Sequence, residues 1–293
     1  MTTNARGKIL MEYYILVKKI GSGAFGDVFV GIDDKNNNYA IKIEKSKEKS
    51  KLMREYKTYN DLYQKHMMAI PKIYNYIETM DYNMLVMELM GMSLEDAFVK
   101  HNKQFSISQV TNIAIQLIDV IAALHSRHYV HRDIKPNNFL IQYNRNDDEN
   151  QTNVSCTTNI NKIYIMDFGL TKKYIVNRQH IEKTKIKSLI GTPRYVSVNV
   201  HENNEPSRRD DLISIGYMLI YFAKGILPWQ KVKYSSKSDL YTKIKECKKN
   251  TPLETLTCGL PNGFLNYMKY VTKLEFEETP NYNALKNMFF NVL

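Results

Sequence analysis

Runs of β-branched and aromatic residues dominate the first third of the chain. They occupy residues 12–20, 27–32 and 39–43, and two later runs of the same character occupy residues 73–77 and 84–87. Short runs of this composition, separated by polar and glycine-containing turns, are typical of β-strands. The pattern therefore predicts a small antiparallel β-sheet.

The pattern then changes to the spacing of helices. Residues 51–64 carry a sustained helical pattern, and a second helix is expected after Ser93, which is followed by acidic residues in the first turn. A third helix is expected at residues 108–125. Its most apolar part, 113–124, is interrupted by Gln116 and Asp119 and falls short of the roughly 20 apolar residues of a membrane span. It is predicted to be a buried amphipathic helix, and no membrane association is expected.

A glycine-rich turn, GSGAFG at residues 21–26, joins the first two predicted strands. The same GxGxxG pattern occurs in dinucleotide-binding folds, but there a helix follows the glycines, whereas residues 27–32 favour a strand. A hairpin of this kind can fold over ATP phosphates, because its backbone N–H groups donate and the missing side chains allow close approach. Ile20 and Val28 would then flank the adenine.

Lys42 is the one lysine in the apolar strand at residues 39–43. A half-buried ammonium group needs a partner, which in a kinase is a phosphate and a helix carboxylate. Glu55 is favoured because it lies within the helical pattern 51–64, while Glu44 and Glu48 are rivals. The alternative is an edge-strand lysine that points into solvent.

The segment His131–Asn138, HRDIKPNN, has the spacing of a kinase catalytic loop. Asp133 would orient the attacking hydroxyl group, Asn138 would bind magnesium, and Lys135 would reach the γ-phosphate. A lysine at that position goes with serine or threonine acceptors. The alternative is a chance octapeptide in a surface loop.

Asp167-Phe168-Gly169 follows a strand expected at residues 162–166, and the Asp167 carboxylate at this strand end can chelate magnesium. Between the two motifs, residues 144–161 are polar and rich in asparagine and lack an apolar period. They are expected to be a flexible surface insertion.

Composition limits the alternatives. The 293 residues suit one large domain or two lobes around a cleft. Three cysteines, Cys156, Cys247 and Cys258, form no CxxC pair, which favours free thiols in a reducing compartment. The first ten residues lack the apolar stretch of a secretion signal. The formal net charge of +11 favours anionic partners, such as acidic or phosphorylated proteins, nucleic acid or a membrane surface.

Together these motifs resemble the eukaryotic protein kinase superfamily, and four segments resemble its casein kinase I branch. Gly191–Asn199, GTPRYVSVN, stands where most kinases have Ala-Pro-Glu and is similar to the branch signature Ser-Ile-Asn. The other segments are Met90–Asp96, Ser207–Leu212 and Leu227–Gln230. The vaccinia-related kinases are the nearest alternative branch.

The resemblance implies an α+β, two-lobed protein kinase fold across residues 1–293. Residues 1–88 would form a lobe with a small antiparallel sheet and one helix, and residues 89–293 a larger, mainly helical lobe. ATP and Mg²⁺ would be the cofactors, with Asn138 and Asp167 as metal ligands. The implied catalytic residues are Asp133 and Lys135. The implied nucleotide-binding residues are Ile20, Gly21, Ser22, Gly23, Ala24, Phe25, Gly26, Asp27, Val28, Ala40, Lys42, Glu55, Met87, Glu88, Leu89 and Leu140.

The resemblance also implies how the catalytic loop is held. Thr192 would contact the loop, and Asp211 would hold its backbone, with the adjacent Asp210 as the competitor. Arg132 usually answers a phosphate on the activation segment, but casein kinase I enzymes are generally active without that phosphate. Basal activity is therefore expected.

Substrate preference follows from an anion site that the family uses for acidic or phosphorylated protein substrates. Arg194 matches one wall of it, and Lys231 and Lys233 are candidates for others, with generic surface charge as their alternative. The family carries a further basic residue a few positions after these lysines, and in this chain it is replaced around Asp239 and Leu240. Recognition of the anion is therefore expected to be altered.

Three other functions compete with an active Ser/Thr kinase. A catalytically weak scaffold would not need Lys42, Asp133, Asn138 and Asp167 together. A nucleic-acid-binding module lacks a basic and aromatic stripe, since the lysines are dispersed. A small-molecule kinase would not need the segment 191–194. A monomer in the cytoplasm or nucleus, without stable nucleic-acid binding, is expected.

Overall fold

The computed structural model describes residues 2–3, 9–11, 13–23, 26–47, 50–142, 160 and 162–290. Ala24, Phe25, Glu48, Cys156 and all of the expected insertion except residue 160 lie outside these ranges. The chain divides into two compact units. Unit 1 comprises Met1–Gly91, Gln142–Arg145 and Tyr164–Gly169, and unit 2 comprises Met92–Ile141, Asn146–Ile163 and Leu170–Leu293.

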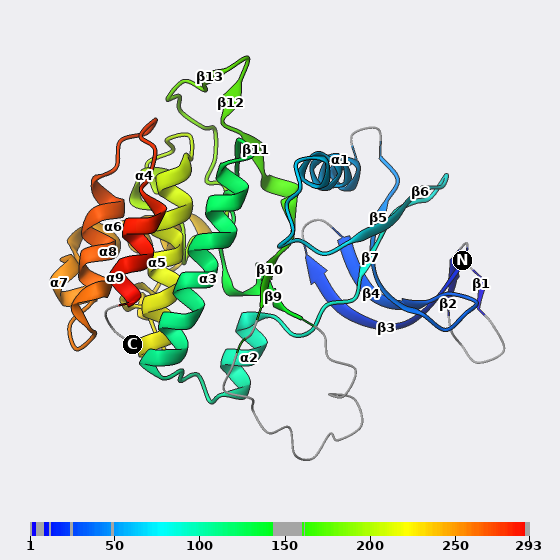
Figure 1. Ribbon diagram of the computed structural model, residues 1–293, viewed down its shortest axis with the longest axis horizontal. Helices are drawn as coiled ribbons and strands as arrows, with labels where there is room; N and C mark the ends of the chain where they lie inside the picture. Colours follow the sequence, from blue (N-terminus) through cyan, green and yellow to red (C-terminus); the bar gives the residue numbers. More distant parts are fainter. Residues whose placement is uncertain are drawn as a thin grey trace. The chain divides into compact units, whose positions relative to one another are not determined.

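Unit 1 is built on an antiparallel sheet of seven strands among the described residues, in the order β1-β2-β3-β4-β5-β7-β6 (Figure 1). The strands are β1 (Thr2–Thr3), β2 (Ile9–Met11), β3 (Tyr14–Gly23), β4 (Gly26–Ile32), β5 (Asn38–Lys45), β6 (Ile73–Glu78) and β7 (Tyr82–Glu88). The five predicted strands are confirmed. β1 and β2 were not predicted, because strands of two and three residues are too short to show a period.

The two faces of the central strands have different roles. In an antiparallel pair, directly opposite residues point to the same face, and successive residues alternate. One face carries a hydrophobic cluster of buried residues, namely Leu16, Ile41, Ile43, Met84 and Val86. The opposite face carries Lys42, whose neighbours across the ladder are Val28 and Leu85. Lys42 therefore lies on the face away from this cluster.

Helix α1 (Lys51–Gln64) has the predicted bounds. Its buried residues, Leu52, Glu55, Thr58, Tyr59 and Leu62, recur every three or four positions and form one stripe. The helix begins after Ser50, whose hydroxyl group accepts the backbone N–H of Met53. This stripe packs against β6 and β7 and brings Glu55 into the interior of unit 1.

Unit 2 is mainly helical. Its helices are α2 (Leu94–Lys100), α3 (Ile107–His125), α4 (Val198–His201), α5 (Arg208–Lys224), α6 (Lys237–Asn250), α7 (Leu253–Leu256), α8 (Asn262–Lys273) and α9 (Tyr282–Phe290). Its described residues also form short 3₁₀ helices, η1 (Pro136–Asn138) and η4 (Pro228–Lys231), and short strands, β8 (Tyr129–Val130), β9 (Phe139–Ile141), β11 (Lys172–Lys173), β12 (Ile175–Val176) and β13 (Gln179–His180). Two elements cross the division of the chain into units, β10 (Ile163–Ile165) and η3 (Phe168–Leu170).

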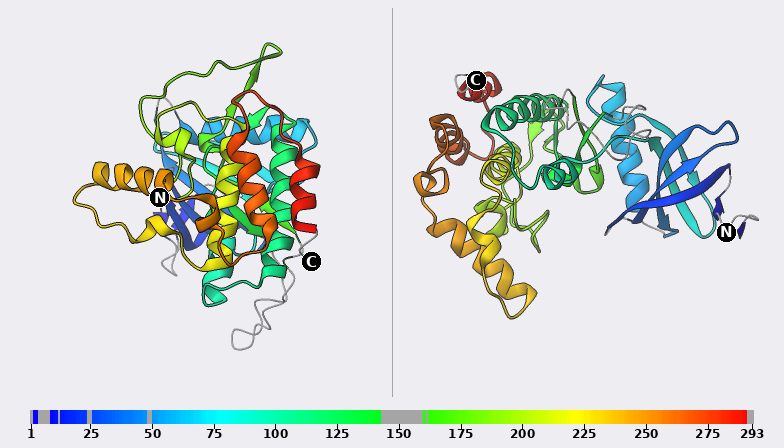
Figure 2. Two further views of the ribbon diagram at one scale, coloured as in Figure 1. Left: turned by 90° about the vertical axis from the view of Figure 1, so that its left-hand side faces the viewer. Right: turned by 90° about the horizontal axis from the view of Figure 1, so that it is seen from below.

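Helices α3, α5, α8 and α9 lie side by side (Figure 2). Helix α5 is the centre of this group, since every residue from Arg208 to Phe222 is buried. Helix α3 is the one described helix that is long and apolar enough to cross a membrane. It packs against α5 and α9, and ten of its side chains, from Val110 to His125, are buried in the unit. It therefore forms part of the core, as its interrupted apolar run predicted.

Candidate functional site

Lys42 is a buried cation between two carboxylates of unit 1. Its Nζ lies 2.7 Å from Glu55 Oε2 and 3.0 Å from Asp167 Oδ1, and its side chain is 6% exposed. Burial lowers the pKa of Lys42, but the two carboxylates outweigh this and raise it above its usual value. Lys42 is therefore charged. The alternative of an edge-strand lysine in solvent is wrong.

Glu55 is the helix partner of Lys42, as predicted, and its rival Glu44 binds elsewhere. Glu44 accepts hydrogen bonds from the Ser50 hydroxyl group and from the backbone N–H of Leu52 at 3.1 Å, so it fixes the start of α1. The other rival, Glu48, lies outside the described residues. Burial raises the pKa of Glu55, and the adjacent ammonium group opposes that effect.

The glycine-rich turn links β3 and β4, whose ladder runs to the pair Gly23 and Gly26. Gly26 has a φ of +121°, and a Cβ there would overlap the carbonyl oxygen of Ile43, so glycine is required at this position for packing. At Gly21 a Cβ would meet Val28 at an ordinary distance of 3.5 Å. Packing therefore does not require glycine at position 21.

The expected nucleotide-binding residues on β3, β4, β5 and β7 differ in their exposure and contacts. Val28, Ala40 and Met87 share the Lys42 face of the sheet. Ala40 and Met87 are buried, and Ile20 is 48% exposed. Asp27 accepts a hydrogen bond from the Ser22 hydroxyl group at 2.7 Å.

Two of the remaining expected residues, Glu88 and Leu89, lie at the end of β7 and directly after it. Glu88, the last residue of β7, donates its backbone N–H to the Lys72 carbonyl group, and Leu89 follows it. Leu140 lies in unit 2 on β9. Ala24 and Phe25 are outside the described residues.

The catalytic-loop residues lie together in unit 2. Asp133 is 5% exposed, and its Oδ2 is 2.6 Å from Lys135 Nζ. Asn138, on η1, donates its side-chain N–H₂ to the Asp133 carbonyl oxygen at 2.9 Å. The alternative of a chance surface loop is excluded, because His131, Asp133 and Asn138 are all buried.

Thr192 contacts the catalytic loop as predicted. Its hydroxyl group donates to Asp133 Oδ1 at 2.8 Å, so each carboxylate oxygen of Asp133 has a donor. The preceding Gly191 has a φ of +91°, and a Cβ there would overlap the Arg132 carbonyl oxygen. Only glycine lets this backbone approach the catalytic loop so closely.

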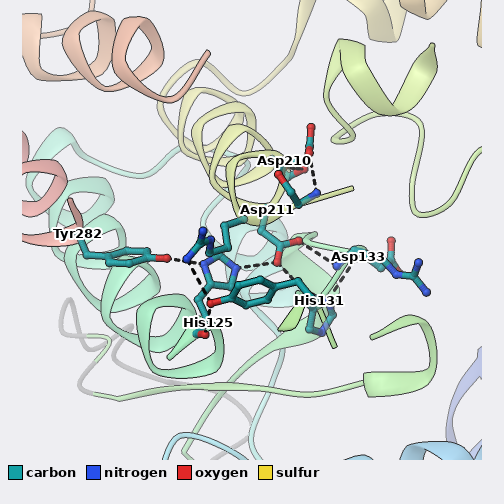
Figure 3. A network of polar contacts seen from close by, with 11 residues as sticks. His125, His131, Asp133, Asp210, Asp211 and Tyr282 are labelled. Atoms are coloured by element: carbon teal, nitrogen blue, oxygen red, sulfur yellow. Dashed lines mark hydrogen bonds and ion pairs between the residues drawn. The ribbon is translucent and has the colours of Figure 1, made fainter. Parts of the chain in front are cut away.

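Asp211 holds the backbone of the catalytic loop, and Asp210 does not. The Asp211 carboxylate accepts the N–H of His131 at 2.7 Å and of Arg132 at 2.9 Å (Figure 3). Burial alone would raise the pKa of Asp211, but His125 and these donors lower it below its usual value. Asp211 is therefore the ionised group that fixes this loop.

Asp210 supports the segment that follows Thr192. It accepts hydrogen bonds from the Ser197 hydroxyl group at 2.5 Å and from the Asn199 amide at 3.3 Å. It also accepts the N–H of Ser207 at 2.8 Å, and burial raises its pKa. The serine and the asparagine of the SVN sequence thus share one buried carboxylate.

A second support of the catalytic loop comes from α3 and α9. His125 Nε2 lies 3.0 Å from Asp211 Oδ2, and His125 Nδ1 lies 2.7 Å from the Tyr282 hydroxyl group (Figure 3). Burial lowers the pKa of His125, so the ring is neutral at pH 7. Because the carboxylate can only accept, Nε2 carries the proton and Nδ1 accepts from Tyr282.

Arg132 has a carboxylate partner within unit 2. Its guanidinium group lies 3.1 Å from Glu205 Oε1, and Lys172 Nζ lies 3.0 Å from Glu205 Oε2. Arg132 also donates to the Leu170 carbonyl oxygen at 2.6 Å. Its φ of +69° is unusual for a residue other than glycine. Arg132 is therefore held by several contacts in a strained backbone conformation.

A pocket of about 470 Å³ lies beside these residues in unit 2. Lys135, Thr192 and Arg194 line it together with Asn137, Pro193, Tyr195, Trp229, Gln230, Val232, Tyr234, Leu240 and Ile244. The structure thus brings Arg194 into one pocket with the catalytic-loop lysine. It does not bring in Lys231 or Lys233, which are exposed and alternate with the lining residues Val232 and Tyr234.

Sequence reasoning did not single out Glu205 and Tyr282, whose contacts are given above, or Lys248, which is buried on α6. Glu205 and Tyr282 carry no motif of their own. Lys248 continues the i, i+4 spacing of Leu240 and Ile244 on α6, and this spacing is the signal that could have identified it as buried.

The candidate magnesium ligands have suitable chemistry. Asn138 uses its N–H₂ group on Asp133, which leaves its amide oxygen without a hydrogen-bond donor among the described residues. Asp167 supplies a carboxylate on a backbone with a φ of +67°. Mg²⁺ prefers such oxygen ligands, so each of the two residues, taken by itself, has the chemistry of a ligand for this ion.

Residues 14–269 match the protein kinase domain family. The chain is 41% identical over 296 residues to casein kinase I homolog 3 of Schizosaccharomyces pombe, covering 100% of this chain and 64% of that protein. It is 39% identical over 294 residues to casein kinase I homolog 2 of the same organism, covering 99% of this chain and 65% of that protein. The chain thus spans less than two thirds of the length of either relative. It belongs to the protein kinase family, and its similarity to these two proteins supports the casein kinase I branch that its motifs resemble.

Proposed function

We propose that this chain is a Ser/Thr protein kinase that transfers the γ-phosphate of ATP to hydroxyl groups of proteins. The observation that carries the proposal is the set of contacts at Asp133, whose two carboxylate oxygens are bound by Thr192 and Lys135. A carboxylate held in one orientation can align an acceptor hydroxyl group and accept its proton. Residues 1–293 would act as a single kinase domain.

Lys42, Glu55 and Asp167 would bind the nucleotide phosphates. The ammonium group is already placed between its two carboxylates, so it needs no rearrangement to meet an anionic ligand. The glycine turn at residues 21–26 would cover the phosphates with backbone N–H groups. Val28, Ala40 and Met87 present apolar side chains on the same face for the adenine.

Asn138 and Asp167 would hold Mg²⁺, which offsets negative charge on the transferring phosphoryl group when it is bound. Lys135 lies beside Asp133 and would contact the same phosphoryl group. Thr192 keeps the Asp133 carboxylate oriented toward the acceptor.

The proposed enzyme is active without phosphorylation of its activation segment. In many kinases an arginine at the position of Arg132 is ordered by a phosphate. Here Glu205 is 6% exposed and supplies a negative charge to Arg132 and Lys172. Treatment with a phosphatase should therefore leave the transfer rate unchanged.

The preferred substrates would carry an acidic or phosphorylated residue near the acceptor. Arg194 supports this proposal, because it lines the pocket that also contains Lys135 and Thr192. Lys231 and Lys233 would contribute only long-range attraction from the surface. Leu240 and Ile244 make another wall of the pocket apolar, which supports an altered preference.

The proposal includes a monomeric protein that acts in the cytoplasm or nucleus. The described cysteines, Cys247 and Cys258, are unpaired, which fits a reducing compartment. The proposal includes no stable binding to nucleic acid.

The test is ³²P transfer from Mg-ATP to casein by the wild type and by Asp133→Asn. The variant should lose about 10²- to 10⁴-fold in kcat while ATP affinity stays within about twofold, since Asp133 acts on the acceptor. A peptide with a phosphoserine three residues before the acceptor should be a better substrate than its unphosphorylated form. A wild type that binds ATP and transfers no phosphate would favour a scaffold instead.

A further inference from the structure

Lys248, on α6, is a buried lysine without a counter-ion. It is 6% exposed, and no carboxylate of the described residues forms an ion pair with it. A buried charge is costly unless other groups compensate for it. Its neighbour Lys249 shows the contrast, because it pairs with Glu202 at 2.9 Å near the surface.

Two carbonyl oxygens and one histidine nitrogen surround the Lys248 ammonium group. Its Nζ lies 2.8 Å from the Pro193 carbonyl oxygen, 2.6 Å from the Val196 carbonyl oxygen and 3.3 Å from His201 Nε2. Burial and the nearby ammonium group lower the pKa of His201 to about 3, so its Nε2 can accept a hydrogen bond. The same Nε2 also lies 3.2 Å from the Pro193 carbonyl oxygen, so it accepts from Lys248 in one tautomer of His201 and donates to Pro193 in the other. The two carbonyl oxygens accept from Lys248 with either tautomer.

Two aromatic rings complete this site. The Lys248 ammonium group lies 5.0 Å from the ring centroids of Tyr217 and Trp229. Cation–π attraction is strongest where water is excluded, so the rings favour the charged form that burial disfavours. Trp229 also donates its indole N–H to the Arg194 carbonyl oxygen at 2.8 Å.

These donors all act on one short segment, residues 193–196. Lys248 binds the carbonyl groups of Pro193 and Val196, and Trp229 binds that of Arg194. The segment is not part of a helix or strand, so its carbonyl groups depend on such donors. Arg194, which lines the pocket, lies within this segment. Thr192, which donates to Asp133, directly precedes it.

We propose that Lys248 is a positioning residue for phosphoryl transfer, which fixes residues 193–196 so that Thr192 meets Asp133 and Arg194 faces the protein substrate. This inference rests on the proposed kinase function. An apolar side chain of similar length could fill the same space, but it would leave the carbonyl groups of Pro193 and Val196 without this donor. The role of Lys248 is therefore directional hydrogen bonding rather than packing.

The test compares Lys248→Met with the matched control Lys249→Met. We expect Lys248→Met to raise KM for a peptide substrate about tenfold, with KM for ATP within about twofold of the wild type. Backbone amide exchange at Tyr195 and Val196, whose N–H groups bind the Thr192 carbonyl oxygen, should become faster. Lys249→Met should leave all three quantities unchanged.

A second variant, Lys248→Gln, replaces the ammonium group by an uncharged amide with two N–H donors and should give an intermediate rise in KM for the peptide. The proposal is overturned if Lys248→Met lowers only the melting temperature, with unchanged peptide KM and unchanged amide exchange at Tyr195 and Val196. It is also overturned if neither variant folds, because Lys248 is then a core residue. If the wild type transfers no phosphate, the proposed function fails, whereas amide exchange in Lys248→Met still decides whether Lys248 fixes the segment.

Discussion

Thr192 Oγ1 donates a hydrogen bond of 2.8 Å to Asp133 Oδ1, although the two residues are 59 positions apart in the chain. The contact joins the catalytic loop to the segment that lines the pocket. It therefore couples the orientation of the candidate catalytic carboxylate to the position of the substrate-side backbone.

Thr192→Val removes this hydrogen bond and keeps the shape of the side chain. A hydrogen bond to a charged group contributes about 1.5 kcal/mol or more, so kcat should fall about tenfold or further. Steady-state kinetics with a peptide substrate would measure this. Thr111→Val is the matched control, because the Thr111 hydroxyl group is buried in α3 and has no hydrogen-bond partner in the described structure. Equal kcat values for Thr192→Val and the wild type would contradict the orienting role.

Lys42→Met leaves Glu55 and Asp167 without their shared cation. Removing one member of a buried ion pair typically costs about 3–5 kcal/mol, so the free energy of unfolding should fall by an amount of this order. The loss of the phosphate-binding cation should also lower kcat/KM for ATP at least about 100-fold. Urea unfolding and transfer assays would measure the two effects.

Lys65→Met is the control for Lys42→Met, since Lys65 pairs with Asp61 near the surface of α1. Pairs of this kind contribute less than about 0.5 kcal/mol. A Lys42→Met protein with wild-type activity would exclude Lys42 from nucleotide binding.

Tyr282→Phe deletes the hydroxyl group that donates to His125 Nδ1. We expect the free energy of unfolding to fall by about 1–2 kcal/mol, because the buried nitrogen loses its donor. A smaller decrease in kcat, about two- to fivefold, should accompany it, since His125 supports Asp211. Tyr270→Phe removes an exposed hydroxyl group that accepts from Asn281 and should have little effect on kcat. A wild-type kcat in Tyr282→Phe would mean that the contacts of Tyr282, His125 and Asp211 contribute to folding stability and not to catalysis.

His201 should make the protein less stable in mild acid. Its pKa is about 3 in the folded chain and 6.5 as its ordinary value, so between these pH values only the unfolded chain binds the proton. Above pH 6.5 His201 is neutral in both states and does not lower the free energy of unfolding. As the pH falls from 6.5 toward 3, protonation of the unfolded chain lowers this free energy progressively. Between pH 7.5 and 5.0 the loss is roughly 2 kcal/mol.

His201→Gln should remove that part of the pH dependence, which urea unfolding at the two pH values would measure. The same slope in His201→Gln and the wild type would contradict the assigned shift.

Much of unit 1 follows from local pattern, because strand and helix periods are properties of neighbouring residues. The helix stripe on α1 identified Glu55 over Glu44, and the structure places Glu55 against Lys42. The choice of Asp211 over Asp210 came from the resemblance to the kinase family and rested on the spacing to Gly216. On α5 the two carboxylates point in different directions, so one reaches the catalytic loop and the other reaches Ser197.

Long-range partners could not be predicted in this way. Helix α6 contains several lysines, and nothing in their local sequence shows that Lys248 binds the carbonyl groups of residues about 50 positions earlier. Lys231 and Lys233 illustrate the converse. Their charge fits an anion site, but the alternation of the backbone turns Val232 and Tyr234 into the pocket.

The link from Tyr282 through His125 to Asp211 bears on the biosynthesis of the chain. The HRD sequence at His131–Asp133 is translated about 150 residues before Tyr282, and Asp211 is also made well before it. A nascent chain that has not yet reached Tyr282 therefore holds every acidic and basic group of the candidate catalytic loop without the last donor of its support. The hydrogen bond from Tyr282 to His125 can form only after α9 has been synthesised. The contacts that support the catalytic loop are therefore completed late in translation.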